Sequence, residues 1–187
     1  MVLSDVSKGV EVLNKQQVLL YPTDTVWGIG CDATSEKAVQ KIFTIKKRSE
    51  SKSLIILVSC IKMLQKYIPN ISSEVLVLLK TVKKPTSIIY SNPVGLAKNV
   101  IAEDNTVAIR IPQNDFCIEL IQQFGKPIVS TSANVSGEPT PKSFSEISQT
   151  ILDSVDYVVS LQREEKNIKS STILKVEENG KIIVLRK

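Results

Sequence analysis

The sequence contains no histidine among its 187 residues. This absence excludes Ser-His-Asp and Cys-His catalysis, imidazole metal ligands and histidine acid–base chemistry together. The motif G-x-x-x-x-G-K-[ST] is also missing, which excludes a P-loop. An enzyme with this composition must therefore work through the placement of charges, hydroxyl groups and backbone amides.

Cysteines and long apolar runs are scarce as well. Cys31, Cys60 and Cys117 are odd in number, far apart and without a C-x-x-C pair, so neither a disulfide framework nor a zinc site is indicated. No apolar run approaches the roughly 18 to 20 residues of a membrane helix, and the first residues lack the basic-then-apolar layout of a signal peptide. These features favour a protein of the reducing cytoplasm without membrane contact.

The charge balance is basic, with a formal net charge of +5 and an isoelectric point of about 9.0. This excess admits an anionic partner such as a nucleotide or RNA, and it is equally typical of a soluble surface rich in lysine. Aromatic residues make up only 5% of the chain and are not interleaved with basic residues. Their scarcity argues against a surface that stacks RNA bases.

Alternating apolar patterns predict one α/β domain over residues 1–187, with a twisted mixed sheet flanked by helices. Strands are expected at 17–23, 53–58, 85–91, 106–111, 127–132 and 156–161, and helices at 4–15, 35–48, 61–68, 72–82 and 115–124. A further helix is expected after Ser143, which has capping-box spacing to Glu146. Gly125 is expected to end the helix before it. The segment 171–187 predicts an antiparallel hairpin that turns on Asn179-Gly180.

The segment Gly28-Ile29-Gly30-Cys31-Asp32-Ala33 formally fits the dinucleotide-binding pattern G-x-G-x-x-[GA]. In that fold the glycines follow a strand directly and an acidic residue ends the next strand about 20 residues later. Here the loop Thr23–Trp27 separates strand from glycine, and the region where the acid should lie is basic. A nicotinamide cofactor is therefore not expected.

A cationic cluster, Lys46, Lys47, Arg48 and Lys52, lies at the end of one predicted helix and just before a strand. Basic residues in the last turn of a helix offset its dipole and are commonly solvated, and this alternative stays open. The position of the cluster near the loop Thr23–Thr25 favours polyphosphate binding, because an arginine fork with flanking lysines supplies several donors. Lys47 is expected to be only solvated.

Two further features stand at ends of predicted strands. Ser130, Thr131, Ser132 and Asn134 crowd the end of an apolar strand, where open α/β sheets tend to bind ligands, although polar loops there are common without any ligand. Arg110 lies inside an otherwise apolar strand and is costly to bury unless it meets an anion. A bound ligand or an internal Asp or Glu could supply that negative charge.

Together these segments resemble the YrdC/TsaC family, the threonylcarbamoyl-AMP synthases. The resemblance runs almost from end to end and rests on YPTDTVWGIG (21–30), the Lys-x-Arg of KKR (46–48), TVAIRIP (106–112), STSANVSGEPTP (130–141) and SSTIL (170–174). It implies a YrdC-like twisted open sheet with a concave basic cavity. It also implies synthesis of an adenylate from L-threonine, bicarbonate and ATP with Mg²⁺, with release of pyrophosphate. The product would feed a separate transferase complex that modifies adenosine in tRNA.

The resemblance also implies roles for individual residues. The nucleotide is expected to meet Arg48, Lys52, Thr106, Ser132, Asn134, Thr140 and Ser171. L-Threonine is expected to meet Thr25, Arg110 and Ser130, with Trp27 as a wall of its pocket. Lys46, Arg48 and Lys52 are expected to stabilise the charge that develops on the phosphates. No residue is expected to hold a metal directly, because Mg²⁺ would bridge phosphates and no carboxylate cluster presents itself.

Three departures from the family pattern stand out. Lys83-Lys84 replace a frequent Pro-Gly pair, Leu57 stands where many relatives have histidine, and the region of Ser160 lacks a frequent acid and glycines. Two other functions remain open at this point. One is a protein that binds double-stranded RNA or tRNA without catalysis, and the other is a carbamoyl or adenylyl transferase with a different acceptor.

Overall fold

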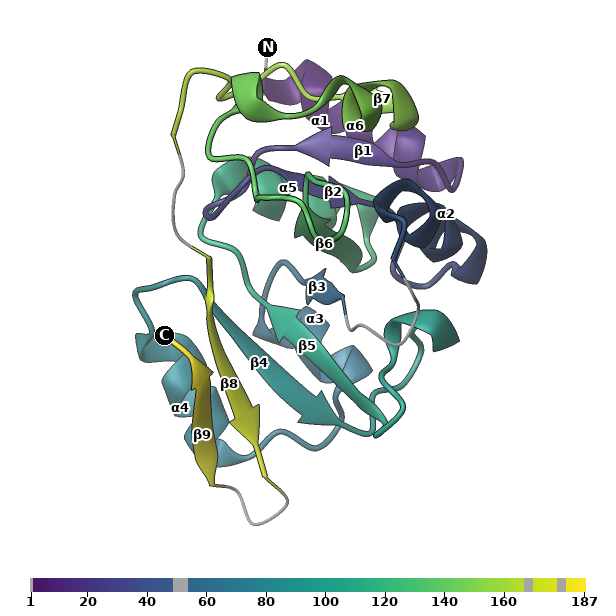
Figure 1. The fold of residues 1–187 in the computed structure, drawn as a ribbon. Helices are drawn as coiled ribbons and strands as arrows, with labels where there is room; N and C mark the ends of the chain where they lie inside the picture. Colours follow the sequence, from purple (N-terminus) through teal and green to yellow (C-terminus); the bar gives the residue numbers. More distant parts are fainter. Residues whose placement is uncertain (1, 49–53, 167–169, 178–180) are drawn as a thin grey trace.

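A computed structural model of the chain describes residues 2–48, 54–166, 170–177 and 181–187 (Figure 1). The helices are α1 (Val2–Asn14), α2 (Glu36–Lys46), α3 (Ile61–Tyr67), α4 (Ser73–Thr81), α5 (Asp115–Phe124) and α6 (Gln149–Ser154), with short 3-10 turns η1 (Lys98–Val100) and η2 (Phe144–Glu146). The strands are β1 (Leu19–Tyr21), β2 (Gly28–Gly30), β3 (Ile55–Leu57), β4 (Thr86–Ser91), β5 (Thr106–Arg110), β6 (Ile128–Ser132), β7 (Tyr157–Val158), β8 (Thr172–Val176) and β9 (Ile182–Arg186).

The described strands form one mixed sheet in the order β7-β1-β2-β6-β3-β5-β4-β8-β9. Three neighbouring pairs are parallel (β1 with β7, β3 with β5, β4 with β8), and the other pairs in this order are antiparallel. Helices α3, α4 and α5 lie behind the sheet in Figure 1, and the chain after β6 passes in front of it. The prediction of a mixed sheet flanked by helices is confirmed.

Strand β2 was not expected, because its sequence, Gly-Ile-Gly, has low strand propensity. Gly30 is needed for close packing. A Cβ atom on Gly30 would lie 2.5 Å from the backbone oxygen of Val129 and 2.6 Å from Cε1 of Tyr21. The G-x-G pattern therefore reflects the close approach of buried strands, and residues 28–30, for which no strand was predicted, form one.

Helix ends were predicted with mixed success. Gly125 ends α5 in the left-handed conformation at φ 77°, as expected. The capping box at Ser143 and Glu146 does not form, because Ser143 Oγ lies 3.0 Å from Ser145 Oγ and Glu146 Oε2 accepts from the Lys142 amide. The chain makes the turn η2 there, and α6 begins only at Gln149.

The core is formed by apolar side chains from both faces of the sheet and the helices that cover them. Helices α1 and α5, far apart in sequence, pack against each other. In the described part of the chain, no helix is both long and apolar enough to cross a lipid bilayer. The hairpin β8–β9 forms as predicted, although its expected turn at Asn179-Gly180 lies outside the described residues.

Candidate functional site

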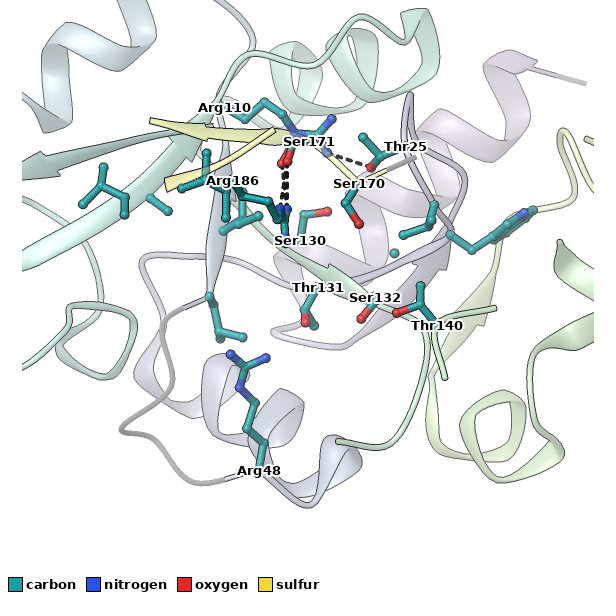
Figure 2. Close-up of a pocket in the computed structure, with 18 residues that line it drawn as sticks. Thr25, Arg48, Arg110, Ser130, Thr131, Ser132, Thr140, Ser170, Ser171 and Arg186 are labelled. Carbon is teal, nitrogen blue, oxygen red and sulfur yellow. Dashed lines mark hydrogen bonds between the residues drawn. The ribbon is translucent and has the colours of Figure 1, made fainter. Parts of the chain in front are cut away.

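A pocket of about 360 Å³ opens over the middle of the sheet and is lined by residues of strands β2, β3, β4, β5, β6, β8 and β9 and of the loops beside them. Figure 2 shows Arg110, Ser171 and Arg186 towards one end of it, Arg48 at the other, and Ser130 and Thr131 between them. Eight of the predicted site residues line it: Thr25, Trp27, Arg48, Arg110, Ser130, Ser132, Thr140 and Ser171. The fold thus brings together side chains from five distant segments of the sequence.

Arg110 is held in place by the loop that follows β1. It forms a salt bridge with Asp24 through Nη1, and both side chains are buried, with 3% and 7% of their surface exposed. The other Asp24 oxygen accepts from the Gln113 amide at 2.9 Å, and Arg110 Nη2 lies 3.3 Å from Thr25 Oγ1. The internal carboxylate that the sequence left open as a partner of Arg110 is therefore Asp24.

The salt bridge leaves Arg110 with donor capacity. Its Nε is buried and has no hydrogen-bond partner among the described residues, and the side chain lines the pocket. A buried, unpaired N–H is costly, and an anion with planar oxygens would satisfy it. The Arg110 end of the pocket is thus suited to a carboxylate ligand.

Thr25 is positioned by its own loop. The Thr25 amide donates to Thr23 Oγ1 at 3.0 Å, the two hydroxyl groups lie 2.9 Å apart, and Thr23 Oγ1 donates to the Val26 carbonyl at 2.8 Å. These bonds tighten the turn between β1 and β2. They place a hydroxyl beside the Arg110 guanidinium.

Lys46 is buried at the end of α2 and is tied to the loop after β6. Its Nζ donates to the carbonyl oxygens of Ser132 at 2.6 Å and Asn134 at 2.7 Å, and its own carbonyl accepts from the Ser136 amide at 2.8 Å. Burial, with a smaller contribution from Arg48, lowers the pKa of Lys46 to about 8. Lys46 is not among the lining residues of the pocket and supports this loop, while its contact with phosphate stays a prediction.

Arg48, two residues later, does line the pocket, and burial lowers its pKa. Lys52, the third member of the predicted phosphate clamp, lies outside the described residues. Lys47 is exposed, as expected, and takes the left-handed conformation that ends the helix. At the end of α2, three adjacent basic residues therefore take three different places. Lys46 supports the loop after β6, Lys47 ends the helix in solvent, and Arg48 lines the pocket.

Thr106 and Asn134 were predicted to contact the nucleotide, and neither lines the pocket in the described part of the chain. Thr106 Oγ1 donates to Asp104 at 2.6 Å, at the opposite end of β5 from Arg110. Asn134 Nδ2 donates to the carbonyls of Val135 and Glu138, while its buried Oδ1 has no partner among the described residues. Asn134 thus braces the same loop that Lys46 holds.

The structure adds Arg186 and Ser170 to the lining, and Thr131 of the polar strand end lines the pocket as well. Arg186 donates from Nε and Nη2 to the Ser171 carbonyl at 3.1 and 2.9 Å. The Ser171 hydroxyl lies 2.9 Å from Ser87 Oγ, which fixes it on the sheet. Sequence reasoning missed Arg186 because a lone arginine near the end of an ordinary hairpin carries no positional signal.

The aromatic side of the pocket is Trp27, which is 3% exposed. Its ring packs against the ring of Phe144, with 5.0 Å between the two centroids. The guanidinium of Arg163 lies 4.5 Å from the centroid of the same Phe144 ring. This tilted ring contact helps to hold the Trp27 side chain in place. It gives the pocket one rigid apolar wall among hydroxyls and arginines.

The three departures from the family pattern take ordinary structural places. Leu57 is fully buried and sits opposite Arg110 in the parallel β3–β5 register. Ser160 donates from its amide and hydroxyl to the buried carboxylate of Asp5, which also accepts from Tyr157. Burial opposes ionisation of Asp5, but these hydrogen bonds outweigh it and lower its pKa. Lys83-Lys84 are exposed in the loop before β4.

Within the described residues, no group of three or more Cys, Asp or Glu side chains is placed to hold a metal ion. The pocket instead offers arginines, short hydroxyls and one indole ring. This combination defines a class of protein: an α/β fold with a pocket over the middle of an open sheet, whose charge and hydroxyl groups suit a small anionic ligand.

The family follows from comparison with known proteins. The family model described as "Telomere recombination", the Sua5/YciO/YrdC domain, matches residues 11–187. The chain therefore belongs to the Sua5/YciO/YrdC family. It is 31% identical over 174 residues to a threonylcarbamoyl-AMP synthase of Psychromonas ingrahamii, covering 91% of this chain and 82% of the relative. It is 30% identical over 145 residues to that of Escherichia coli O6:H1, covering 76% of each.

Solved structures share the fold. P. abyssi Sua5 complexed with L-threonine superimposes with a TM-score of 0.86 at 23% identity, covering all of this chain. This chain spans 54% of that longer Sua5 chain. E. coli YciO superimposes with a TM-score of 0.84 at 20% identity, covering 97% of this chain and 88% of YciO. At these identities the superpositions establish the fold.

Proposed function

We propose that this protein is a threonylcarbamoyl-AMP synthase, which makes threonylcarbamoyl-AMP and pyrophosphate from L-threonine, bicarbonate and ATP. Relatives of that name, at 31% and 30% identity, support the reaction. The observation that carries the proposal in this chain is one pocket that holds both a buried arginine with an unpaired Nε and a second arginine across a row of hydroxyl groups.

The amino acid would bind at the Arg110 end. Arg110 would take the carboxylate through its unpaired Nε, since Asp24 and Thr25 already occupy its other face. Thr25 and Ser130 would bind the polar groups of the substrate, and Trp27 would pack against its methyl group. A pocket that binds both the hydroxyl and the methyl of threonine would discriminate against amino acids that lack either group.

The nucleotide would bind from the Arg48 end of the pocket along the row of hydroxyl groups. Arg48, Ser132 and Thr140 line the pocket, and Lys52 is expected to join them. The nucleotide would extend to Ser171, which lies towards the Arg110 end (Figure 2). Thr106 and Asn134 would act at most through the loops they hold. Mg²⁺ would enter as part of the ATP substrate, bound to phosphate oxygens, because the described residues offer it no carboxylate cluster.

The proposed reaction suits a protein without histidine, because the substrate supplies the nucleophile. The threonine amine adds to CO₂, in equilibrium with bicarbonate, and loses a proton to give a carbamate. A carbamate oxygen then attacks the α-phosphorus, the bond to the bridging oxygen breaks, and pyrophosphate leaves with the electron pair. The protein orients the two substrates and stabilises the growing phosphate charge with Arg48. This makes the enzyme a nucleotidyltransferase.

The biological role that we propose is tRNA modification in the cytoplasm. Threonylcarbamoyl-AMP would pass to a separate transferase complex that adds threonylcarbamoyl to adenosine, and tRNA could also contact this protein directly. Arg48, Arg110 and Arg186 line one small pocket, and Trp27 is buried. Both features favour the enzyme over an RNA-binding protein without catalysis.

The proposal is tested by incubating the protein with MgATP, bicarbonate and each amino acid in turn, and by measuring pyrophosphate release. Release that requires threonine and bicarbonate is the expected result. Release without threonine would favour transfer to another acceptor, and no release combined with tight RNA binding would favour the RNA-binding alternative.

Two substitutions test the assigned residues. Arg48→Ala and Arg110→Gln should each abolish adenylate formation while the protein stays folded, because each removes a charged contact to one substrate. Glutamine is chosen at Arg110 because it can still hydrogen-bond the buried Asp24 carboxylate. Substitution of the exposed neighbour, Lys47→Asn, is the control. Near-normal synthesis by both site variants would overturn the assignment.

A further inference from the structure

The side chain of Arg186 reaches the pocket because of an irregularity in the last two strands. The antiparallel register pairs Leu174 with Val184 and then Ile173 with Arg186, so that Leu185 is an extra residue on β9. Ile173 and Arg186 both line the pocket, while the Leu185 residue is 55% exposed. This is a β-bulge, which commonly redirects a side chain beside a functional site.

The consequence of the bulge follows from the two-residue period of a strand. In a regular ladder, Ile173 would pair with Leu185, and Thr172 would pair with Arg186. Arg186 would then point to the opposite side of the sheet, because successive side chains alternate between faces. One inserted residue therefore decides whether a leucine or an arginine enters the pocket.

The guanidinium of Arg186 is oriented but its charge is not neutralised. Nε and Nη2 donate to the Ser171 carbonyl, and Nη2 lies 3.5 Å from Ser171 Oγ. In the part of the chain that the structure describes, no carboxylate pairs with Arg186, whereas Asp24 pairs with Arg110. Arg186 thus brings to the pocket a positive charge whose direction is set by backbone that it already binds.

We infer that Arg186 is a phosphate-binding residue of this pocket, which the register shift at Leu185 places beside Ser171 to contact the polyphosphate of the nucleotide. The inference rests on the proposed function for the identity of the ligand. Figure 2 shows the arrangement that supports it, with Arg186 and Arg48 on different sides of the row of hydroxyl side chains. Two arginines so placed can hold different parts of one extended anion.

The test measures binding of MgATP, magnesium pyrophosphate and adenosine to the full chain by isothermal titration calorimetry. Arg186→Gln should weaken the binding of ATP and pyrophosphate about tenfold or more, because it removes a charge-assisted contact. Adenosine, which has no phosphate, should bind unchanged. The neighbouring charge substitution Lys187→Gln is the control and should leave all three affinities unchanged.

A second variant separates position from net charge. The exchange Leu185→Arg with Arg186→Leu keeps the composition but moves the arginine to the exposed bulge position. It should lose phosphate affinity as Arg186→Gln does. Normal phosphate binding by either variant would overturn the inference, and so would an equal loss of adenosine binding, which would indicate a structural role.

Pyrophosphate release keeps the two proposals apart. If the wild-type protein binds ATP through Arg186 but releases no pyrophosphate with threonine, the proposed function fails and this inference stands. If release depends on threonine and Arg186→Gln binds ATP normally, this inference alone fails.

Discussion

The buried lysine at the end of α2 makes a quantitative prediction about pH. Folding lowers the pKa of Lys46 from its ordinary value of 10.5 to about 8. Between these two values the unfolded chain binds more protons than the folded chain, so the contribution of Lys46 to the free energy of unfolding rises with pH. From pH 7 to pH 9.5 this rise is about 2 kcal/mol, from 1.36 kcal/mol for each pKa unit.

The assay is urea denaturation of the wild type and Lys46→Met at several pH values between 7 and 10. The difference between the two free energies of unfolding isolates the contribution of Lys46, since the other titrating groups are common to both proteins. At pH 7 the difference should be small. The Met variant leaves the Asn134 carbonyl without its donor, at a cost of about 1–3 kcal/mol, but it also removes a costly buried charge.

The stability of the wild type relative to Lys46→Met should therefore increase by about 2 kcal/mol between pH 7 and 9.5. Lys47→Asn, which removes an exposed charge one residue away, should show no such increase. A difference that stays flat, or that falls with pH, would refute the reasoning. It would mean that the Lys46 ammonium is not desolvated against the loop.

Two further predictions concern the strands around the pocket. Gly30→Ala should destabilise the fold by about 2–3 kcal/mol in chemical denaturation, because its Cβ would meet the Val129 carbonyl oxygen at 2.5 Å. Gly28→Ala should cost about 1 kcal/mol or less, because the closest contact of its Cβ is a side-chain hydroxyl at 3.2 Å. Equal losses would contradict this account of β2. Asp24→Asn should raise KM for threonine about tenfold with little change in KM for ATP, because Arg110 loses its charged partner. Both constants are measured by steady-state kinetics. Parallel rises in the two constants would instead indicate a general structural effect.

The helices and most strands were predictable because apolar periodicity reports burial directly. Helix α5 has this pattern together with a glycine stop, and its limits match the prediction. Strand β2 was not predictable, because glycine suppresses the strand signal and its purpose is visible only beside Val129. The prediction of a helix directly after Ser143 was wrong for the opposite reason. A local capping pattern is present there, but contacts with neighbouring residues override it.

The candidate site was predictable where a polar residue interrupts an apolar strand or crowds its end. Arg110 and Ser130 were found in this way, and both line the pocket. The role of Lys46 was not predictable, because Lys46 and Arg48 look alike in sequence, and only the packing of α2 against the loop after β6 turns one to the backbone and the other to the pocket.

By itself, the sequence determined the class of fold, the absence of histidine chemistry and the polar segments from which a site could be built. These properties depend on composition and on local periodicity, and both can be read from the sequence without knowing which distant segments are in contact. The tertiary structure alone decided that Asp24 neutralises Arg110, that Lys46 supports a loop, and that one extra residue on β9 turns Arg186 towards the pocket. Each of these depends on contacts between segments far apart in sequence, and a shift of one residue in register reverses the face to which a side chain points.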